Sequence, residues 1–118
     1  MNPLCLLLSD DLIDASRVVG HGRAAGLNVV HCRDVAKLLA EITRQPAVVI
    51  LDLHFPALDL EAIVPTVQAC GSKLIGFGAH VDATRLKAAR QAGCDEVLPR
   101  SAFFEGLEAK LAAWASIN

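Results

Sequence analysis

The fold is indicated most clearly by residues 48–59, Val48-Val49-Ile50-Leu51-Asp52-Leu53-His54-Phe55-Pro56-Ala57-Leu58-Asp59. The first four of these residues are continuously apolar and mostly β-branched, a pattern typical of a strand that is buried on both faces. The run ends at Asp52, and a loop containing Pro56 follows it. A buried strand of this kind indicates a parallel sheet covered by helices, with the loop at the carboxyl edge of the sheet.

Strands and helices are expected to alternate on both sides of this stretch. The apolar runs predict strands over residues 4–8, 28–31, 47–53, 73–77 and 95–98. Apolar residues at helical spacing predict helices over 12–25, 35–44, 60–70, 83–92 and 102–114. Because the connections are short, we expect a doubly wound α/β domain of parallel strands joined by right-handed crossovers.

Polar residues and glycines mark the predicted helix ends. Three aspartates are expected as N-caps: Asp34, Asp59 and Asp82. Gly26 and Gly93 follow predicted helices as C-terminal caps. Pro65 falls inside the helix at 60–70, which predicts a bend or a late start there.

We expect one small domain over residues 1–118, with no output domain. The net charge is -2, without a long run of one sign, whereas a nucleic-acid binder normally shows a basic face. No apolar stretch reaches the roughly 18 residues of a membrane span. The N-terminus has no basic segment typical of a signal peptide. We therefore expect a cytoplasmic protein that contacts neither nucleic acid nor membrane directly.

The cysteines are scattered along the chain. They are Cys5, Cys32, Cys70 and Cys94, and no two form a CxxC pair. A zinc site from cysteine and histidine is conceivable, but the ligand spacing does not support one. Reduced, buried thiols are the expected state.

Three aspartates are predicted to meet at the carboxyl edge of the sheet. Asp10 and Asp11 follow the first strand and Asp52 ends the third, and these strands are neighbours in the order 2-1-3-4-5. Any one of them alone would be an ordinary helix cap or turn residue. Together they favour a cation site, because oxygen ligands suit Mg²⁺ with several waters. A carboxylate there could also attack an activated phosphoryl group.

Three segments resemble the receiver domains of bacterial two-component response regulators, and the resemblance extends over essentially the whole chain. They are residues 6–11, 48–59 and 91–98. The resemblance implies a flavodoxin-like, CheY-like fold with five parallel strands in the order 2-1-3-4-5. It also implies a role in phosphorelay signal transduction. Such a domain is not an enzyme, beyond magnesium-dependent self-phosphorylation and slow autodephosphorylation.

The same resemblance implies roles for individual residues. Asp52 would be the phosphoacceptor. A weakly bound Mg²⁺ would be held by Asp11, Asp52 and the backbone carbonyl of His54, with Asp10 assisting through water. The implied partner is a histidine kinase or another signalling protein. It would dock on the fourth helix, fifth strand and last helix, at residues 81–92, 95–98 and 102–114.

The chain departs from the receiver pattern where receivers read the phosphoryl group. Gly78, beside Ala79, stands where a Ser or Thr hydroxyl is usual. Arg100 replaces the usual lysine, and its planar fork could pair bidentately with Asp52 or Asp10. Ser101 stands where receivers have a proline in a cis peptide bond, and it would also suit a helix N-cap. Val97 stands at the aromatic switch position. The expectation is an atypical receiver phosphorylated on Asp52. The alternative is a pseudo-receiver that binds a partner without phosphorylation.

Other ligands fit the sequence less well. The tripeptide Asp52-Leu53-His54 matches the D-x-H motif of cobalamin-binding domains, but Ala57 stands where those domains have a glycine. A flavin site is disfavoured because no Ser/Thr/Gly-rich loop follows the first strand. His54 and His80 border the predicted pocket, where His54 either orients a hydrolytic water or is an ordinary loop histidine.

Overall fold

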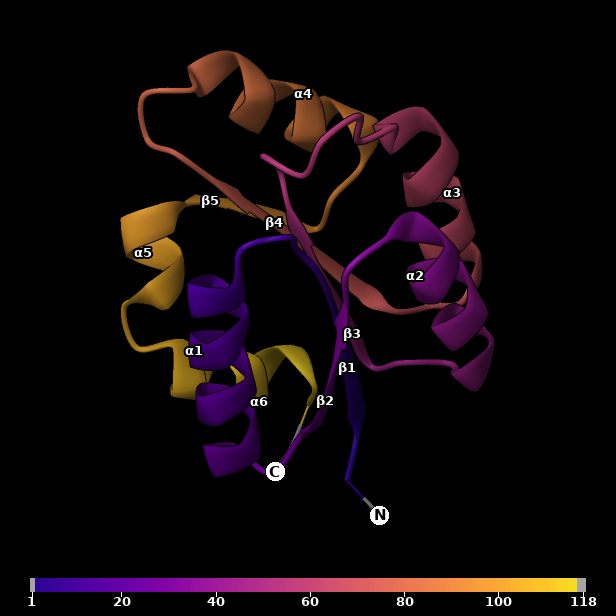
Figure 1. Ribbon diagram of the computed structural model, residues 1–118, viewed down its shortest axis with the longest axis vertical. Coiled ribbons are helices and arrows are strands. Elements are labelled where there is room, and N and C mark those ends of the chain that lie inside the picture. Colours follow the sequence, from indigo (N-terminus) through magenta and orange to yellow (C-terminus); the bar gives the residue numbers. More distant parts are fainter. Residues whose placement is uncertain (1, 117–118) are drawn as a thin grey trace.

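The computed structural model describes residues 2–116, and these form a parallel sheet between two layers of helices (Figure 1). The strands are β1 (Leu4–Leu8), β2 (Asn28–Cys32), β3 (Val48–Asp52), β4 (Lys73–Gly78) and β5 (Glu96–Pro99). They lie in the order β2-β1-β3-β4-β5, and every neighbouring pair is parallel. The predicted doubly wound, flavodoxin-like fold is confirmed.

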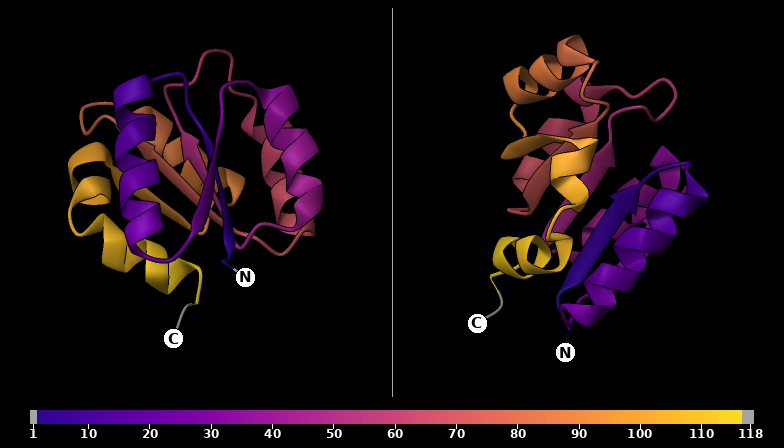
Figure 2. Two further views of the ribbon diagram at one scale, coloured as in Figure 1. Left: turned by 60° about the horizontal axis from the view of Figure 1, so that its bottom comes forward. Right: turned by 90° about the vertical axis from the view of Figure 1, so that its left-hand side faces the viewer.

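The helices divide between the two faces of the sheet (Figure 2). One face is covered by α2 (Val35–Glu41) with its 3-10 turn η1 (Ile42–Arg44), α3 (Leu60–Ala69) and α4 (Ala83–Ala92). The other is covered by α1 (Leu12–Ala24), α5 (Arg100–Phe104) and α6 (Leu107–Trp114). This arrangement leaves the carboxyl edge of the sheet open for a site.

Alternating strand residues fill two hydrophobic cores. In β3, for example, Val49 and Leu51 face α2 and α3, whereas Ile50 faces α1 and α6. All five residues of β3 are buried, which explains its continuous apolar run. The few aromatic residues belong mainly to the second core, where the rings of Phe77 and Phe103 stack with centroids 4.4 Å apart. These aromatic side chains are therefore core residues.

The predicted caps are in place. Each capping aspartate accepts a hydrogen bond from a backbone N–H three residues on: Asp34 from Lys37, Asp59 from Ala62 and Asp82 from Arg85. Gly93 closes α4 with a φ of 111°, a conformation that favours glycine. Pro65 lies inside α3, which begins directly after its cap, so the predicted late start is wrong.

The last predicted helix is wrong in one respect, because residues 102–114 do not form a single helix. The chain leaves α5 at Glu105, whose backbone is extended, and Gly106 follows with a φ of 60°. The apolar spacing continues across this break, so periodicity alone did not reveal it. Ser101 lies inside α5 and does not cap it, because Pro99 holds the N-cap position.

Two other expectations concern the whole described chain. The four cysteines are free, and Cys5 and Cys32 are completely buried. Within residues 2–116, no helix combines the length and apolar character that crossing a membrane requires.

Candidate functional site

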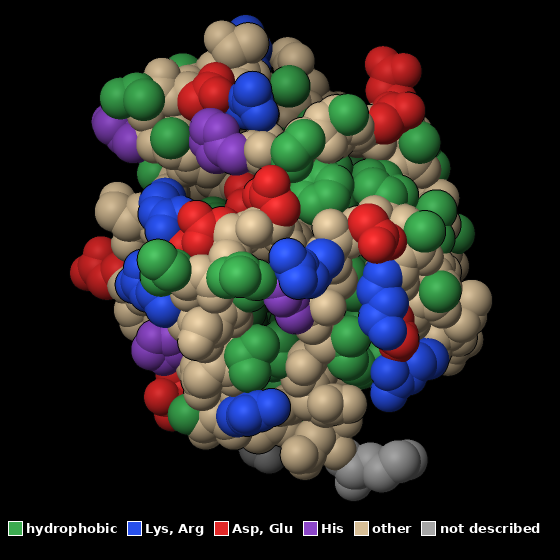
Figure 3. Space-filling model, in the orientation of Figure 1, with side chains coloured by type: hydrophobic (Ala, Val, Ile, Leu, Met, Phe, Trp, Pro, Cys, Tyr) green, Lys and Arg blue, Asp and Glu red, His purple; other side chains and the backbone are tan. Residues whose placement is uncertain are grey.

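The carboxyl edge of the sheet carries a pocket of about 330 Å³. Leu8 pairs with Leu51, so the loops after β1 and β3 begin side by side. The pocket is lined by Asp10, Asp11, Asp14, Asp52, His54, Phe77, Gly78, Ala79 and Arg100. The predicted metal-ligand, phosphoacceptor and phosphoryl-pocket residues are among them, whereas His80, which was expected to border the pocket, is not. Figure 3 shows acidic, basic and histidine side chains meeting on this part of the surface, above α1.

Asp52, the last residue of β3, is held by two donors. Its Oδ2 accepts a hydrogen bond of 2.8 Å from the Ser9 hydroxyl, and its Oδ1 accepts one of 3.0 Å from the backbone N–H of His54. Only 5% of Asp52 is exposed, and Ser9 is fully buried. The carboxylate therefore has a fixed orientation at the bottom of the pocket.

Ser9 was not among the predicted site residues, but it connects several parts of the site. Its hydroxyl oxygen accepts a hydrogen bond of 3.1 Å from the backbone N–H of Asp11, while its hydrogen goes to Asp52. Its carbonyl oxygen accepts one of 2.7 Å from Nε2 of His31. A serine directly before the aspartate pair, at the end of a strand beside β3, was the available signal.

Asp10 and Asp11 differ in their roles. Asp11 caps α1, because its Oδ1 accepts hydrogen bonds from the backbone N–H groups of Ile13 and Asp14 at 2.9 and 3.0 Å. The ordinary capping role therefore applies to Asp11, in addition to any ligand role. Asp10 is exposed beside it.

The donors suit Mg²⁺ chemically, but they do not form a ready-made cage. Across residues 2–116, no three histidine, cysteine or acidic side chains lie close enough to hold a metal ion together. Mg²⁺ usually takes one or two carboxylates and keeps several waters. The oxygen-only donor set of the pocket therefore fits a largely hydrated, weakly held ion.

Arg100 pairs with a residue that the sequence did not suggest. Its two terminal nitrogens donate to both carboxylate oxygens of Asp14, 86 positions away, and the expected pairing with Asp52 or Asp10 is wrong. Asp14 is 1% exposed, so its charge needs such a partner. The hydrogen bond to Asp14 also raises the pKa of Arg100, with smaller contributions from the charges of Asp11 and Asp52.

The end of β4 meets the loop after β3 through His54. The backbone N–H of Ala79 donates to Nε2 of His54 at 2.9 Å, so this imidazole has a defined partner. The space beside Gly78 would accept a side chain. A Cβ at this position would lie 3.4 Å from Cβ of Leu53 and 3.5 Å from both Nε2 of His54 and Cδ2 of Leu86, which are ordinary contacts.

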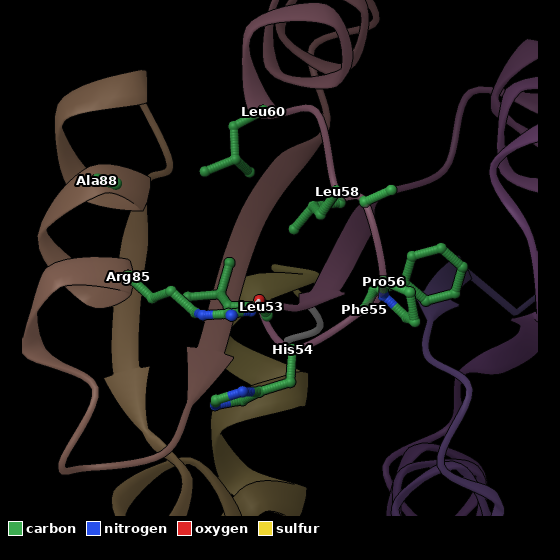
Figure 4. A pocket seen from close by; sticks show the side chains of 9 residues that line it. Leu53, His54, Phe55, Pro56, Leu58, Leu60, Arg85 and Ala88 are labelled. Atoms are coloured by element: carbon green, nitrogen blue, oxygen red, sulfur yellow. Dashed lines mark hydrogen bonds between the residues drawn. The ribbon is translucent and has the colours of Figure 1, made fainter.

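A second groove, of about 450 Å³, lies between the loop after β3 and α4 (Figure 4). It is lined by Leu53, His54, Phe55, Pro56, Ala57, Leu58, Leu60, Arg85 and Ala88. Arg85 reaches from α4 to donate a hydrogen bond of 2.9 Å to the carbonyl of Leu53, and it pairs with Asp82 at 2.8 Å. The loop that follows Asp52 is thus fastened to α4.

Solved receiver domains resemble the chain over nearly its whole length. A response regulator from Thermotoga maritima has a TM-score of 0.81 at 16% identity, over 98% of this chain and 99% of that one. A receiver domain from Bermanella marisrubri has 0.81 at 19%, over 97% and 98%. The chemotaxis response regulator CheY4 of Vibrio cholerae has 0.75 at 14%, over 94% and 99%.

Searches by sequence gave no corresponding match. No protein-family model matches the chain, and no curated protein matches it. At identities of this level the likeness establishes the fold alone. The predicted resemblance to receiver domains is therefore confirmed for the architecture of the chain.

Proposed function

We propose that this chain is an atypical receiver module of two-component signalling, in which Asp52 accepts a phosphoryl group. One observation carries the proposal: a buried, oriented carboxylate ends β3 in a pocket that also holds Asp10 and Asp11. The receiver fold of the chain supports it. Turnover of a separate substrate is not part of this function.

The chemistry follows from the way Asp52 is held. Ser9 and the backbone N–H of His54 each occupy one lone pair of the carboxylate, which leaves others available for reaction. A carboxylate oxygen of Asp52 attacks the phosphorus of an acyl phosphate or phosphohistidine. The bond from phosphorus to the donor breaks, the leaving group takes the electron pair, and an acyl phosphate forms on Asp52.

The acidic residues, together with one backbone carbonyl, would hold a largely hydrated Mg²⁺. Asp11, Asp52 and the backbone carbonyl of His54 would be ligands, and Asp10 would contribute through water. A bound Mg²⁺ neutralises charge on the incoming phosphoryl oxygens. Without a cation, the repulsion between these carboxylates and a phosphoryl group opposes transfer.

A second candidate function is a pseudo-receiver that binds its partner without phosphorylation. The groups that would bind a phosphoryl group already have partners, which favours this second function. Arg100 is paired with Asp14, and the backbone N–H of Ala79 donates to His54. Gly78 supplies no hydroxyl. Val97, 6% exposed, has no aromatic ring that could move between buried and exposed positions.

In either case the partner would be a protein. We propose a histidine kinase or another signalling protein, docked on the face formed by α4, β5 and the last two helices, α5 and α6. The side chain of Val81, 90% exposed just before α4, offers an apolar contact at the edge of this face. Direct binding to nucleic acid or membrane is not expected, and a cytoplasmic location stays a prediction.

Incubation with acetyl phosphate and Mg²⁺, followed by intact-mass spectrometry, tests the proposal. We expect one phosphoryl adduct, which disappears when Mg²⁺ is omitted and in Asp52→Asn. The Asn side chain keeps the shape of the carboxylate but is not the nucleophile. No adduct, under conditions that label an ordinary receiver domain, would favour the pseudo-receiver.

Amide spectra with and without beryllofluoride and Mg²⁺ separate switching from static behaviour. Shifts in α4, and in residues 73–76 of β4, would support phosphorylation-driven switching, since these residues do not line the pocket. Shifts confined to the pocket would instead indicate a surface that stays the same in both states.

A further inference from the structure

Within residues 2–116, Asp14 and Arg100 form the one ion pair between residues far apart in the sequence, and it joins α1 to α5. Asp14 lies in the first turn of α1, and Arg100 begins α5, which Figure 1 shows beside that end of α1. Both carboxylate oxygens accept from the guanidinium, so the pair is bidentate. The two residues differ in exposure, because Asp14 is 1% exposed while the Arg100 side chain is 44% exposed.

Arg100 also belongs to the pocket of Asp52. It lines that pocket, and the charges of Asp11 and Asp52 act on it. Its hydrogen bonds nevertheless go to Asp14 and to no other carboxylate among residues 2–116. The guanidinium group also lies over the ring of Phe104, 5.3 Å from its centroid, which holds the side chain against α5.

The burial of Asp14 decides which carboxylate retains Arg100. If Arg100 moved toward Asp52, it would leave a carboxylate without a partner inside the protein, which is strongly unfavourable. Asp52 does not depend on Arg100 in this way, because Ser9 and the N–H of His54 already satisfy its oxygens. The competition for the guanidinium therefore favours Asp14.

We infer that Asp14 is a positioning residue that holds Arg100 away from the phosphoacceptor position at Asp52. Charge added at Asp52 then does not recruit Arg100, and the start of α5 stays in place. This regulation rests on the proposed function of Asp52, but the ion pair itself can be tested without phosphorylation.

The test follows the side-chain Nε–H signal of Arg100 by NMR in four chains: wild type, Asp52→Asn, Asp14→Asn and the double variant. We expect Asp52→Asn to shift the signal only slightly in the wild-type background, because Arg100 stays bound to Asp14. In the Asp14→Asn background the same change at Asp52 should shift the signal clearly, because the freed guanidinium turns to Asp52. Asp34→Asn, which neutralises the cap of α2 outside the pocket, should have no effect in either background.

Two results would overturn the inference. One is a clear shift of the Arg100 signal on Asp52→Asn in the wild-type background, and the other is no shift in the Asp14→Asn background. If Asp14→Asn does not fold, Asp14→Leu takes its place, because an apolar side chain of similar size leaves no buried polar group unpaired.

Beryllofluoride with Mg²⁺ adds a separate readout. In the wild type we expect it to move the backbone signals of His54 and Ala79 but not the Arg100 side chain, whereas in Asp14→Asn all three should move. If the backbone signals do not move in any variant, the proposed phosphoacceptor fails, while the four-chain comparison still decides the role of Asp14.

Discussion

The Ser9 hydroxyl donates a hydrogen bond of 2.8 Å to Oδ2 of Asp52, which joins the ends of β1 and β3 through buried side chains. The same oxygen accepts from the backbone N–H of Asp11, so one serine orients both a candidate metal ligand and the candidate phosphoacceptor. Both contacts depend on the residues that directly follow β1, Ser9-Asp10-Asp11.

Replacement of Ser9 by Ala should destabilise the fold. The change removes a donor from the buried Asp52 carboxylate and an acceptor from the N–H of Asp11, and we expect a loss of about 1–3 kcal/mol in the free energy of unfolding. Urea denaturation measures it. Ser16→Ala, at an exposed position of α1, is the matched control and should stay within about 0.5 kcal/mol of wild type. Equal losses in the two variants would contradict the role given to Ser9.

Gly78→Ser should strengthen the phosphorylated state. The new Cβ would make only ordinary contacts with Leu53, His54 and Leu86, so the free energy of unfolding should change by less than about 1 kcal/mol. The hydroxyl would donate to a phosphoryl oxygen, and a larger fraction of the chain should carry the adduct at steady state with acetyl phosphate. Gly78→Ala adds the same Cβ without the hydroxyl and should leave this fraction unchanged. If both variants raised the fraction equally, the hydroxyl would not be the cause.

Two glycines of α1 should respond in opposite ways to alanine. A Cβ at Gly22 would lie 2.2 Å from Cγ2 of Val29, so Gly22→Ala must displace the Val29 side chain or push α1 away from β2, and it should cost about 1–3 kcal/mol. Gly20 has nothing within 4 Å of such a Cβ, and Gly20→Ala should stabilise the helix by about 0.5–1 kcal/mol. Thermal unfolding of both variants measures the contrast. Destabilisation by Gly20→Ala would contradict it.

Stability should fall at alkaline pH because of buried thiols. Burial raises the pKa of Cys5 from 9.0 to about 12, with a smaller contribution from Cys32. Burial likewise raises the pKa of Cys32 from 9.0 to about 11. Since the unfolded thiols ionise first, this stability is fully present below about pH 9 and is lost as the pH rises toward the folded values. The free energy of unfolding, measured by urea denaturation, should be lower at about pH 10 than at about pH 8 by about 1 kcal/mol per thiol.

Cys5→Ala provides the control for this pH dependence. It removes one of three such thiols, since burial also raises the pKa of Cys94 to about 11. It should therefore reduce the loss of stability between the two pH values, even though it lowers stability at both. An unchanged difference would mean that other groups cause the alkaline loss.

The gathering of the site residues could be predicted from sequence because parallel topology fixes where strand ends meet. Asp52 ends a strand that is unmistakably buried, and Asp10 and Asp11 end its neighbour, so their common pocket follows from the strand order. Caps such as Asp34 were equally predictable, because capping is a local interaction between residues three positions apart.

The contacts that tune the site could not be predicted in this way. Asp14 and Arg100 are 86 positions apart, and no local pattern links them. Asp14 occupies a core-facing position of α1, which was a signal that its charge needs a partner. The break between α5 and α6 depends on the left-handed backbone of Gly106, while the apolar pattern continues across it.

Borohydride reduction shows whether Asp52 forms the acyl phosphate. The chain is incubated with acetyl phosphate and Mg²⁺ and then treated with borohydride, which converts an aspartyl phosphate to homoserine. Peptide sequencing by mass spectrometry locates the product. We expect homoserine at position 52, with aspartate unchanged at positions 10 and 11. Aspartate retained at position 52, or homoserine at another position, would show that Asp52 is not the phosphoacceptor.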